Sequence, residues 1–195
     1  MAITLNGSTG ITSANIADGA IAAGDLASSL DLTGKTVTLP SGTGGKVLQV
    51  VTNLIDTSGS VSGSSWQTIV SASITPSNAS NKILIFATTM FANVTGGALE
   101  MGTRIYNGSA AVVQGASNSS TTRAFLGGRI LLEAYNSWTP TMVCFETAGT
   151  TSSKTYSVQC YGSENQAVYY NRTNNLGYEY TFTGATTITL MEIAA

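Results

Sequence analysis

The chain has 195 residues, of which only 9% are charged, and its formal net charge is −2. Ordinary domains carry about a quarter charged residues, and here serine and threonine take their place. Because there is no basic cluster, neither nucleic acid nor an anionic membrane is an expected electrostatic partner. The composition is that of short β-strands with polar outer faces, and it is not that of a disordered chain.

Within residues 1–28, apolar side chains recur every five residues at Ile11, Ile16, Ile21 and Leu26. A five-residue step rotates an α-helix by about 140° beyond one turn, and in a strand it sends successive side chains to opposite faces. One chain alone therefore cannot gather these side chains into a core, whereas several chains around a common axis could. We predict an oligomeric stem here, with an unstructured tail as the alternative. The expected stem contacts are Ile11, Ile16, Ile21, Leu26, Leu30 and Leu32.

Residues 29–45 are predicted to form a neck and hinge. Apolar residues alternate with polar ones up to Leu39, which is typical of a strand. Pro40 ends this run because it donates no ladder hydrogen bond. The segment from Ser41 to Gly45 is rich in glycine, which gives the backbone wide freedom.

Residues 46–195 are predicted to form an all-β head. Trp66, Thr68 and Val70 fall on one predicted strand face, and residues 82–92 are apolar at odd and even positions, which predicts burial on both faces. Regularly spaced turns favour an antiparallel β-sandwich, with a jelly roll as the preferred topology. Strands are predicted over 47–51, 66–74, 82–92, 99–106, 110–113, 123–133, 141–146, 154–161, 167–171 and 186–193.

The sequence contains no pattern for a metal site, a cofactor or a catalytic centre. Histidine is absent, which excludes His-based triads and zinc sites with His ligands. Phosphate-binding and calcium-binding loop patterns are also missing. Cys144 and Cys160 lie in apolar strand contexts, where we expect two buried free thiols instead of a disulfide. We predict no catalytic residue, no metal and no cofactor.

Glycoside hydrolysis is the enzymatic alternative, because it needs only two carboxylates about 5–9.5 Å apart. Most of the acidic residues of the head stand alone on predicted strands or loop tips, which favours solvated carboxylates or subunit contacts. They are Asp56, Glu100, Glu133, Glu146, Glu164, Glu179 and Glu192.

Ligand recognition is better supported than catalysis. Tyrosine, asparagine and arginine are concentrated in residues 161–180, and Trp138 falls in a predicted inter-strand loop. Aromatic faces beside neutral amides suit a sugar or a protein surface. Packing in the core or between subunits is the alternative for these residues. The candidates are Trp138, Tyr161, Asn165, Tyr169, Tyr170, Asn171, Arg172, Asn174, Asn175 and Tyr178.

Several segments resemble the tail-fibre and other virion-appendage proteins of bacteriophages, especially those of marine bacteria. The neck carries Leu-Asp-Leu-Thr-Gly-Lys-Thr-Val-Thr-Leu-Pro-Ser-Gly-Thr-Gly-Gly-Lys-Val-Leu-Gln-Val at 30–50. Further matches are Ile-Ala-Asp-Gly-Ala-Ile at 16–21, Ile-Thr-Pro-Ser-Asn-Ala-Ser-Asn-Lys-Ile-Leu-Ile at 74–85 and Thr-Ile-Thr-Leu-Met-Glu-Ile at 187–193.

This resemblance implies a structural virion protein, a homotrimeric tail fibre that is not an enzyme. The segment 1–28 would dock onto other virion proteins, and the head would contact a host surface polysaccharide or outer-membrane protein. A head fibre or capsid decoration protein and a polysaccharide-degrading appendage enzyme are the alternatives. The start of the chain lacks the pattern of a secretory signal, and the longest apolar run is too short to span a bilayer. We therefore expect synthesis in the host bacterial cytoplasm, incorporation into the virion, and no membrane insertion.

Overall fold

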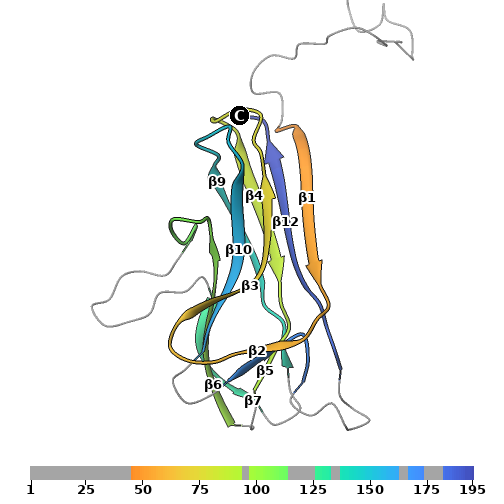
Figure 1. The fold of residues 1–195 in the computed structure, drawn as a ribbon, viewed down its shortest axis with the longest axis vertical. Helices are drawn as coiled ribbons and strands as arrows, with labels where there is room; N and C mark the ends of the chain where they lie inside the picture. The colour runs from red at the N-terminus through yellow and green to blue at the C-terminus, as the bar shows by residue number, and fades with distance from the viewer. Residues whose placement is uncertain (1–44, 94–96, 114–125, 133–136, 163–166, 174–181) are drawn as a thin grey trace, which may run out of the picture. The chain divides into compact units, whose positions relative to one another are not determined.

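The computed structural model describes residues 45–93, 97–113, 126–132, 137–162, 167–173 and 182–195 (Figure 1). The predicted stem and the predicted neck as far as residue 44 lie outside these residues. The expected stem contacts therefore stay predictions, and they are Ile11, Ile16, Ile21, Leu26, Leu30 and Leu32. The described residues belong almost entirely to the predicted head.

Strands account for all the regular structure in this part of the chain, which accordingly holds no helix long and apolar enough to cross a membrane. Twelve strands are described: β1 (Val47–Ile55), β2 (Gly59–Val61), β3 (Trp66–Ile74), β4 (Lys82–Thr88), β5 (Phe91–Asn93), β6 (Gly97–Tyr106), β7 (Leu126–Leu132), β8 (Ser137–Trp138), β9 (Thr141–Thr147), β10 (Lys154–Gly162), β11 (Val168–Tyr170) and β12 (Thr186–Ile193).

The eight longest strands form two four-stranded antiparallel sheets, with the orders β1-β12-β4-β9 and β3-β10-β6-β7. Numbered 1 to 8 along the chain, these strands read 1-8-3-6 in one sheet and 2-7-4-5 in the other. This is the strand order of a jelly roll, in which two Greek keys wrap the chain between facing sheets. The order confirms the predicted all-β jelly-roll sandwich.

The main core lies between the two sheets and consists of the side chains that alternate inward along each strand. Its members are Val70, Ala72, Ile74, Ile83, Ile85, Ala87, Ile105, Met142, Cys144, Ala148, Tyr156, Val158, Ile188 and Leu190. The two cysteines are free and buried, as predicted. Burial raises the pKa of Cys144 to about 11 and that of Cys160 to about 12, so both thiols stay protonated at neutral pH.

One expectation about β4 is wrong for the chain on its own. Ile83, Ile85 and Ala87 are buried on the inward side, but Phe86 on the outward side is 37% exposed. The apolar pattern of β4 predicted burial on both faces. Within the part of the chain that the structure describes, only the inward face is covered.

A third sheet, with the order β2-β11-β5-β8, continues the β1-β12-β4-β9 sheet beyond a break. Each of its short strands comes directly before or after the corresponding strand of the large sheet in the order of strands, and the four pairs follow the same spatial order. The side chains of Val61, Phe91 and Val168 from the small sheet pack with Met101 and Cys160 from β6 and β10 in a second core cluster.

Asn171 holds this break together. It follows β11 with a backbone φ of 57°, in the left-handed region that asparagine tolerates better than most residues. Its Nδ2 donates hydrogen bonds to the carbonyls of Ile55 and Thr57, both at 3.1 Å, and its Oδ1 accepts one from the hydroxyl of Thr186 at 2.8 Å. Its backbone N–H donates to the carbonyl of Met90. One fully buried residue thus joins the breaks of β1, β4 and β12 through its side chain and its backbone.

β3 contains a bulge at Ile69. Val70 and Thr68 pair with consecutive residues of β10, so Ile69 is an extra residue without a partner in the register. The bulge shifts Trp66 and Thr68 to the outward face, whereas Val70 stays inward. The prediction that all three share one face is therefore wrong, because a one-residue insertion reverses every side chain beyond it.

Replacing Asn171 tests how much this residue contributes to the stability of the fold. Asn171→Ala leaves the carbonyls of Ile55 and Thr57 without their donor, leaves the buried hydroxyl of Thr186 without its acceptor and places alanine at a positive φ, so the free energy of unfolding should fall by about 2–4 kcal/mol. Urea titration measures this value. Asn53→Ala is the control, because Asn53 is exposed and donates to the carbonyl of Ser71, and it should cost about 1 kcal/mol or less. Equal losses in the two variants would contradict the role of Asn171.

Candidate functional site

The structure does not gather the sequence-predicted binding residues on one surface. Asn165, Asn174, Asn175 and Tyr178 lie outside the described residues. Asn171 is fully buried, and its amide is used inside the fold, so its expected place on a binding surface is wrong.

Trp138 and Tyr170 pack against the core, which was the alternative to a place on a binding surface. Trp138 belongs to β8 and not to a loop, and its ring lies 6.5 Å from that of Phe91. Tyr170 packs against the same second core cluster, with its ring against Gly59. Both rings therefore stabilise the small sheet.

Tyr169 and Arg172 form a pair of their own. The Arg172 guanidinium lies 3.8 Å from the centroid of the Tyr169 ring, which is a cation–π contact. Both side chains are half-buried. This pair lies at the small sheet, apart in sequence and in strand from the surface that carries Tyr161.

Tyr161 leads to a group of side chains that we call the aromatic platform. It comprises Trp66 on β3, Tyr161 and Gln159 on β10, and Arg104 and Tyr106 on β6. The rings of Trp66 and Tyr161, which are cross-strand partners, have centroids 5.5 Å apart. All five side chains are half-buried and lie on the outward face of the β3-β10-β6-β7 sheet.

Arg104 is the centre of the platform. Its guanidinium lies 4.2 Å from the Trp66 ring centroid and 5.1 Å from that of Tyr106. Its Nε donates to Oε1 of Gln159 at 2.8 Å, and Gln159 in turn donates to the hydroxyl of Thr68 at 3.2 Å. Burial lowers the pKa of Arg104, partly offset by Tyr106, but a guanidinium stays charged in proteins.

The platform offers the chemistry of an adaptable binding surface. The aromatic rings provide flat apolar contact, while the guanidinium and the Gln159 amide provide hydrogen bonds of fixed direction. Such a set suits a sugar or a polar protein surface. A rigid sheet holds it, which limits the entropy lost on binding.

Sequence reasoning found Tyr161 but missed the other four platform residues. The bulge at Ile69 hides Trp66, because it breaks the alternation of β3. Arg104 and Tyr106 had a usable signal, since they alternate with Met101, Thr103 and Ile105, all of which are buried. That alternation was enough to predict that Arg104 and Tyr106 share the outward face of the strand.

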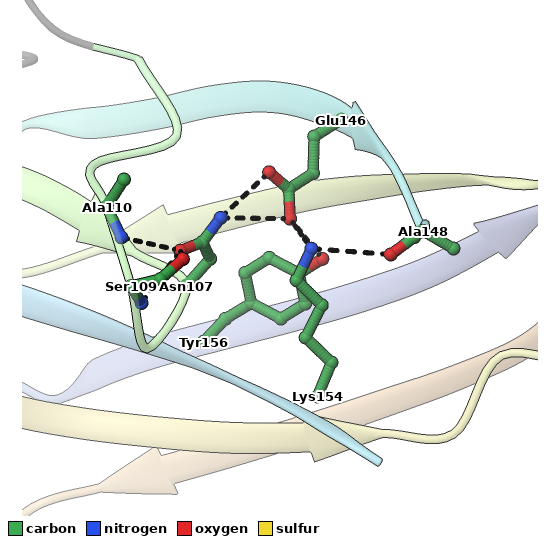
Figure 2. A network of polar contacts seen from close by, with 7 residues as sticks. All are labelled: Asn107, Ser109, Ala110, Glu146, Ala148, Lys154 and Tyr156. Atoms are coloured by element: carbon green, nitrogen blue, oxygen red, sulfur yellow. Dashed lines mark hydrogen bonds and ion pairs between the residues drawn. The ribbon is translucent and has the colours of Figure 1, made fainter. Parts of the chain in front are cut away.

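At the end of the sandwich away from the small sheet, Glu146 joins the two large sheets (Figure 2). This β9 carboxylate accepts hydrogen bonds from the Tyr156 hydroxyl at 2.7 Å and from Nδ2 of Asn107 at 3.1 Å, and it pairs with Lys154. Asn107 also closes its own turn by accepting from the N–H of Ala110. Burial by itself would raise the pKa of Glu146, but these partners lower it.

Glu192 forms a second carboxylate network at the same end. It is fully buried, and it accepts from Nε2 of Gln49 and Nδ2 of Asn81, both at 2.6 Å. The backbone N–H and the hydroxyl of Ser77 donate as well, each at 2.8 Å. Burial would raise its pKa, but the hydrogen bonds outweigh that effect and hold the pKa at about 2.

Neither of the two carboxylates has the raised pKa that a glycosidase acid needs. Glu146 and Glu192 are the cross-strand partners of Ile83 on either side, which places their backbones roughly 10 Å apart. A glycosidase acid needs a raised pKa, and both groups have lowered ones. Among the described residues no group of three metal-binding side chains occurs. Glu133, Glu164, Glu179 and the side chain of Glu100 lie outside the described part.

No protein-family model and no curated protein matches this sequence. Among solved structures, the infectious bursal disease virus VP2 subviral particle shares 15% identity over 87% of this chain and 47% of that chain, with a TM-score of 0.42. The infectious bursal disease virus Gx strain shares 15% over 76% and 38%, and the T13 particle of this virus 11% over 75% and 38%, both with a TM-score of 0.39. This chain spans less than half the length of each.

The Glu192 network predicts a specific dependence of stability on pH. Because the pKa of Glu192 is about 2 in the folded chain against an ordinary 4.5, its carboxylate stabilises the fold above pH 4.5 and loses that effect as the pH falls towards 2. Glu192→Gln should lower the free energy of unfolding at pH 7 by about 2–3 kcal/mol and flatten the change across this window.

Thermal unfolding between pH 2 and pH 7 measures both effects. Asp56→Asn changes an exposed carboxylate and should keep the wild-type profile. A Glu192→Gln variant with the wild-type slope in this window would show that other groups control it.

Proposed function

We propose that this chain is a structural protein of a bacteriophage virion, a homotrimeric tail fibre whose head contacts the host cell surface. The observation that carries the proposal is the contrast between the two outer faces of the jelly roll. One is apolar, with Val50, Leu54 and Phe145 exposed, and the other carries the aromatic platform. This contrast suits a subunit that its assembly covers on one side and leaves open on the other.

The segments whose sequence resembles phage appendage proteins also interact with one another in the structure, which supports the proposal. Residues 30–50, 74–85 and 187–193 are far apart in sequence, but one network joins them. Glu192 of the last segment accepts from Gln49 of the first and from Ser77 and Asn81 of the second. The described parts of the three segments thus meet at one end of the sandwich.

The proposed mechanism is multivalent attachment without chemistry. Each head offers one platform, and three platforms on one fibre raise the effective affinity because later contacts are intramolecular. Segment 1–28 would dock onto other virion proteins after synthesis in the host cytoplasm. The receptor class is a surface polysaccharide or an outer-membrane protein, and the aromatic and amide groups of the platform favour the polysaccharide.

Binding to immobilised surface polysaccharide from a susceptible host tests the platform. Trp66→Ala removes the largest flat contact and should weaken binding by about tenfold or more. Arg104→Gln should also weaken it, because the guanidinium hydrogen bonds are lost. Biolayer interferometry measures the dissociation constants, and circular dichroism confirms that each variant folds.

Tyr169→Ala is the matched control, since it removes an aromatic ring that pairs with an arginine outside the platform. It should bind as the wild type does. Loss of binding in Tyr169→Ala with wild-type affinity in Trp66→Ala would move the receptor site to the small sheet.

Immunogold electron microscopy of virions that contain the chain tests its location. We expect label at the tail fibres, because the proposal places segment 1–28 in the tail. Label spread over the capsid would instead identify a head fibre or decoration protein. Purified virions without any label would contradict a structural role in the particle.

A further inference from the structure

The outward side of the β1-β12-β4-β9 sheet is apolar across its whole width, and we call it the outer apolar face. Val50, Leu54, Val143 and Phe145 are between 46% and 65% exposed. The face spans all four strands, from β1 at one edge to β9 at the other.

The register aligns these residues in two continuous rows. Successive cross-strand partners in the first row are Val50, Met191, Leu84 and Phe145. Those in the second row are Thr52, Thr189, Phe86 and Val143. With strands about 4.8 Å apart, the patch measures on the order of 300 Å², the size at which exposed apolar patches on monomers are often functional.

The polar groups of this face are already paired with one another. The hydroxyls of Thr52 and Thr189 lie 3.1 Å apart, and those of Thr88 and Thr141 lie 2.9 Å apart. Lys82, the one ionisable residue at the outward positions of these four described strands, donates to the hydroxyl of Thr147 at 2.6 Å. Removing water from the face therefore leaves few groups without a partner.

The opposite outer face has a different composition. Its outward positions carry Ser71, Ser73, Thr155 and Ser157 beside the aromatic platform. The hydroxyl groups of that surface can bond to water, whereas the exposed valine, leucine and phenylalanine side chains of the outer apolar face cannot. The two-sided apolar pattern of β4 agrees, because it is typical of a strand that is covered on both sides.

The occupant that fits best is another copy of this chain. Residues 1–44, which include the segment predicted to join copies of the chain, lead in sequence into β1, an edge strand of this sheet. In the proposed stem, Ile11, Ile16 and Ile21 would contact other copies of the chain and so would not cover the head. A nearly uncharged face also brings no like-charge repulsion against itself.

We propose that the outer apolar face is the surface through which the heads of this protein associate with one another. The inference deepens the proposed self-assembly, on which it rests, by naming the residues that the assembly buries. Phe145, the most exposed of them, is expected at the contact.

Hydroxyl-radical footprinting of the full chain tests the proposal without any mutation. Phe145 and Phe182 are 65% and 69% exposed in one chain, and Phe91 is fully buried, so they form a matched set of one residue type. We expect Phe145 to be oxidised as slowly as Phe91, while Phe182 serves as the exposed reference. Light scattering on the same sample should give three times the 20.0 kDa protomer mass.

A charge on the face supplies the second readout. Phe145→Asp should raise the dissociation constant of the oligomer by about 30-fold or more, since a buried aromatic contact is replaced by a carboxylate. Thr155→Asp places the same charge at an exposed position of the opposite outer face and should leave the constant unchanged. Circular dichroism checks that both variants fold.

Each other outcome overturns the inference in a distinguishable way. A trimer in which Phe145 reacts like Phe182 rules out this face but keeps the proposed homotrimer. A monomer with a protected Phe145 shows that the chain's own residues cover the face, and a trimer that Phe145→Asp does not weaken places the contact between copies elsewhere. A monomer with an exposed Phe145 removes the homotrimer as well, and protection that arises only in the virion assigns the face to another virion protein.

Discussion

β12 lies between β1 and β4, and its inward side chains Thr186, Ile188, Leu190 and Glu192 are all fully buried. Thr186 bonds Asn171 at the break between the sheets, the two apolar residues fill the centre of the core, and Glu192 closes the opposite end. A slip of one residue would turn all four outward at once. The same slip would place Ile193 at the inward position of Glu192 and leave the donors on Gln49, Ser77 and Asn81 without their acceptor. Glu192 therefore specifies the register that the apolar centre stabilises.

The two outer faces show how one alternating pattern serves two purposes. Inward positions build a core that a single chain completes, while outward positions differ from sheet to sheet. In the β3-β10-β6-β7 sheet, Arg104 packs against two aromatic rings that stay half-buried. In the β1-β12-β4-β9 sheet, threonine hydroxyls bond each other and leave a surface of valine, leucine and phenylalanine. The proposed attachment and the proposed assembly thus use opposite sides of the same head and do not compete.

The fold was predictable because alternation and turn residues are local signals, and they placed most long strands and the sandwich class. Three features were not, because each depends on distant partners. Ile69 is a bulge only with respect to β10, so Trp66 was assigned to the wrong face. Asn171 was expected at a surface, but its amide bonds carbonyls 116 and 114 residues away. The platform assembles from three strands, so only Tyr161, beside a tyrosine-rich stretch, was found in advance.

The scarcity of charge on the outer apolar face has a consequence for the medium in which such heads associate. At 1 M ionic strength the Debye length is only about 3 Å, and contacts between exposed charges are largely screened. Phenylalanine, valine and leucine with mutually bonded hydroxyls lose nothing to screening, and excluded salts such as sulfate strengthen apolar burial. Association through this surface would therefore hold equally well in dilute buffer and in brine.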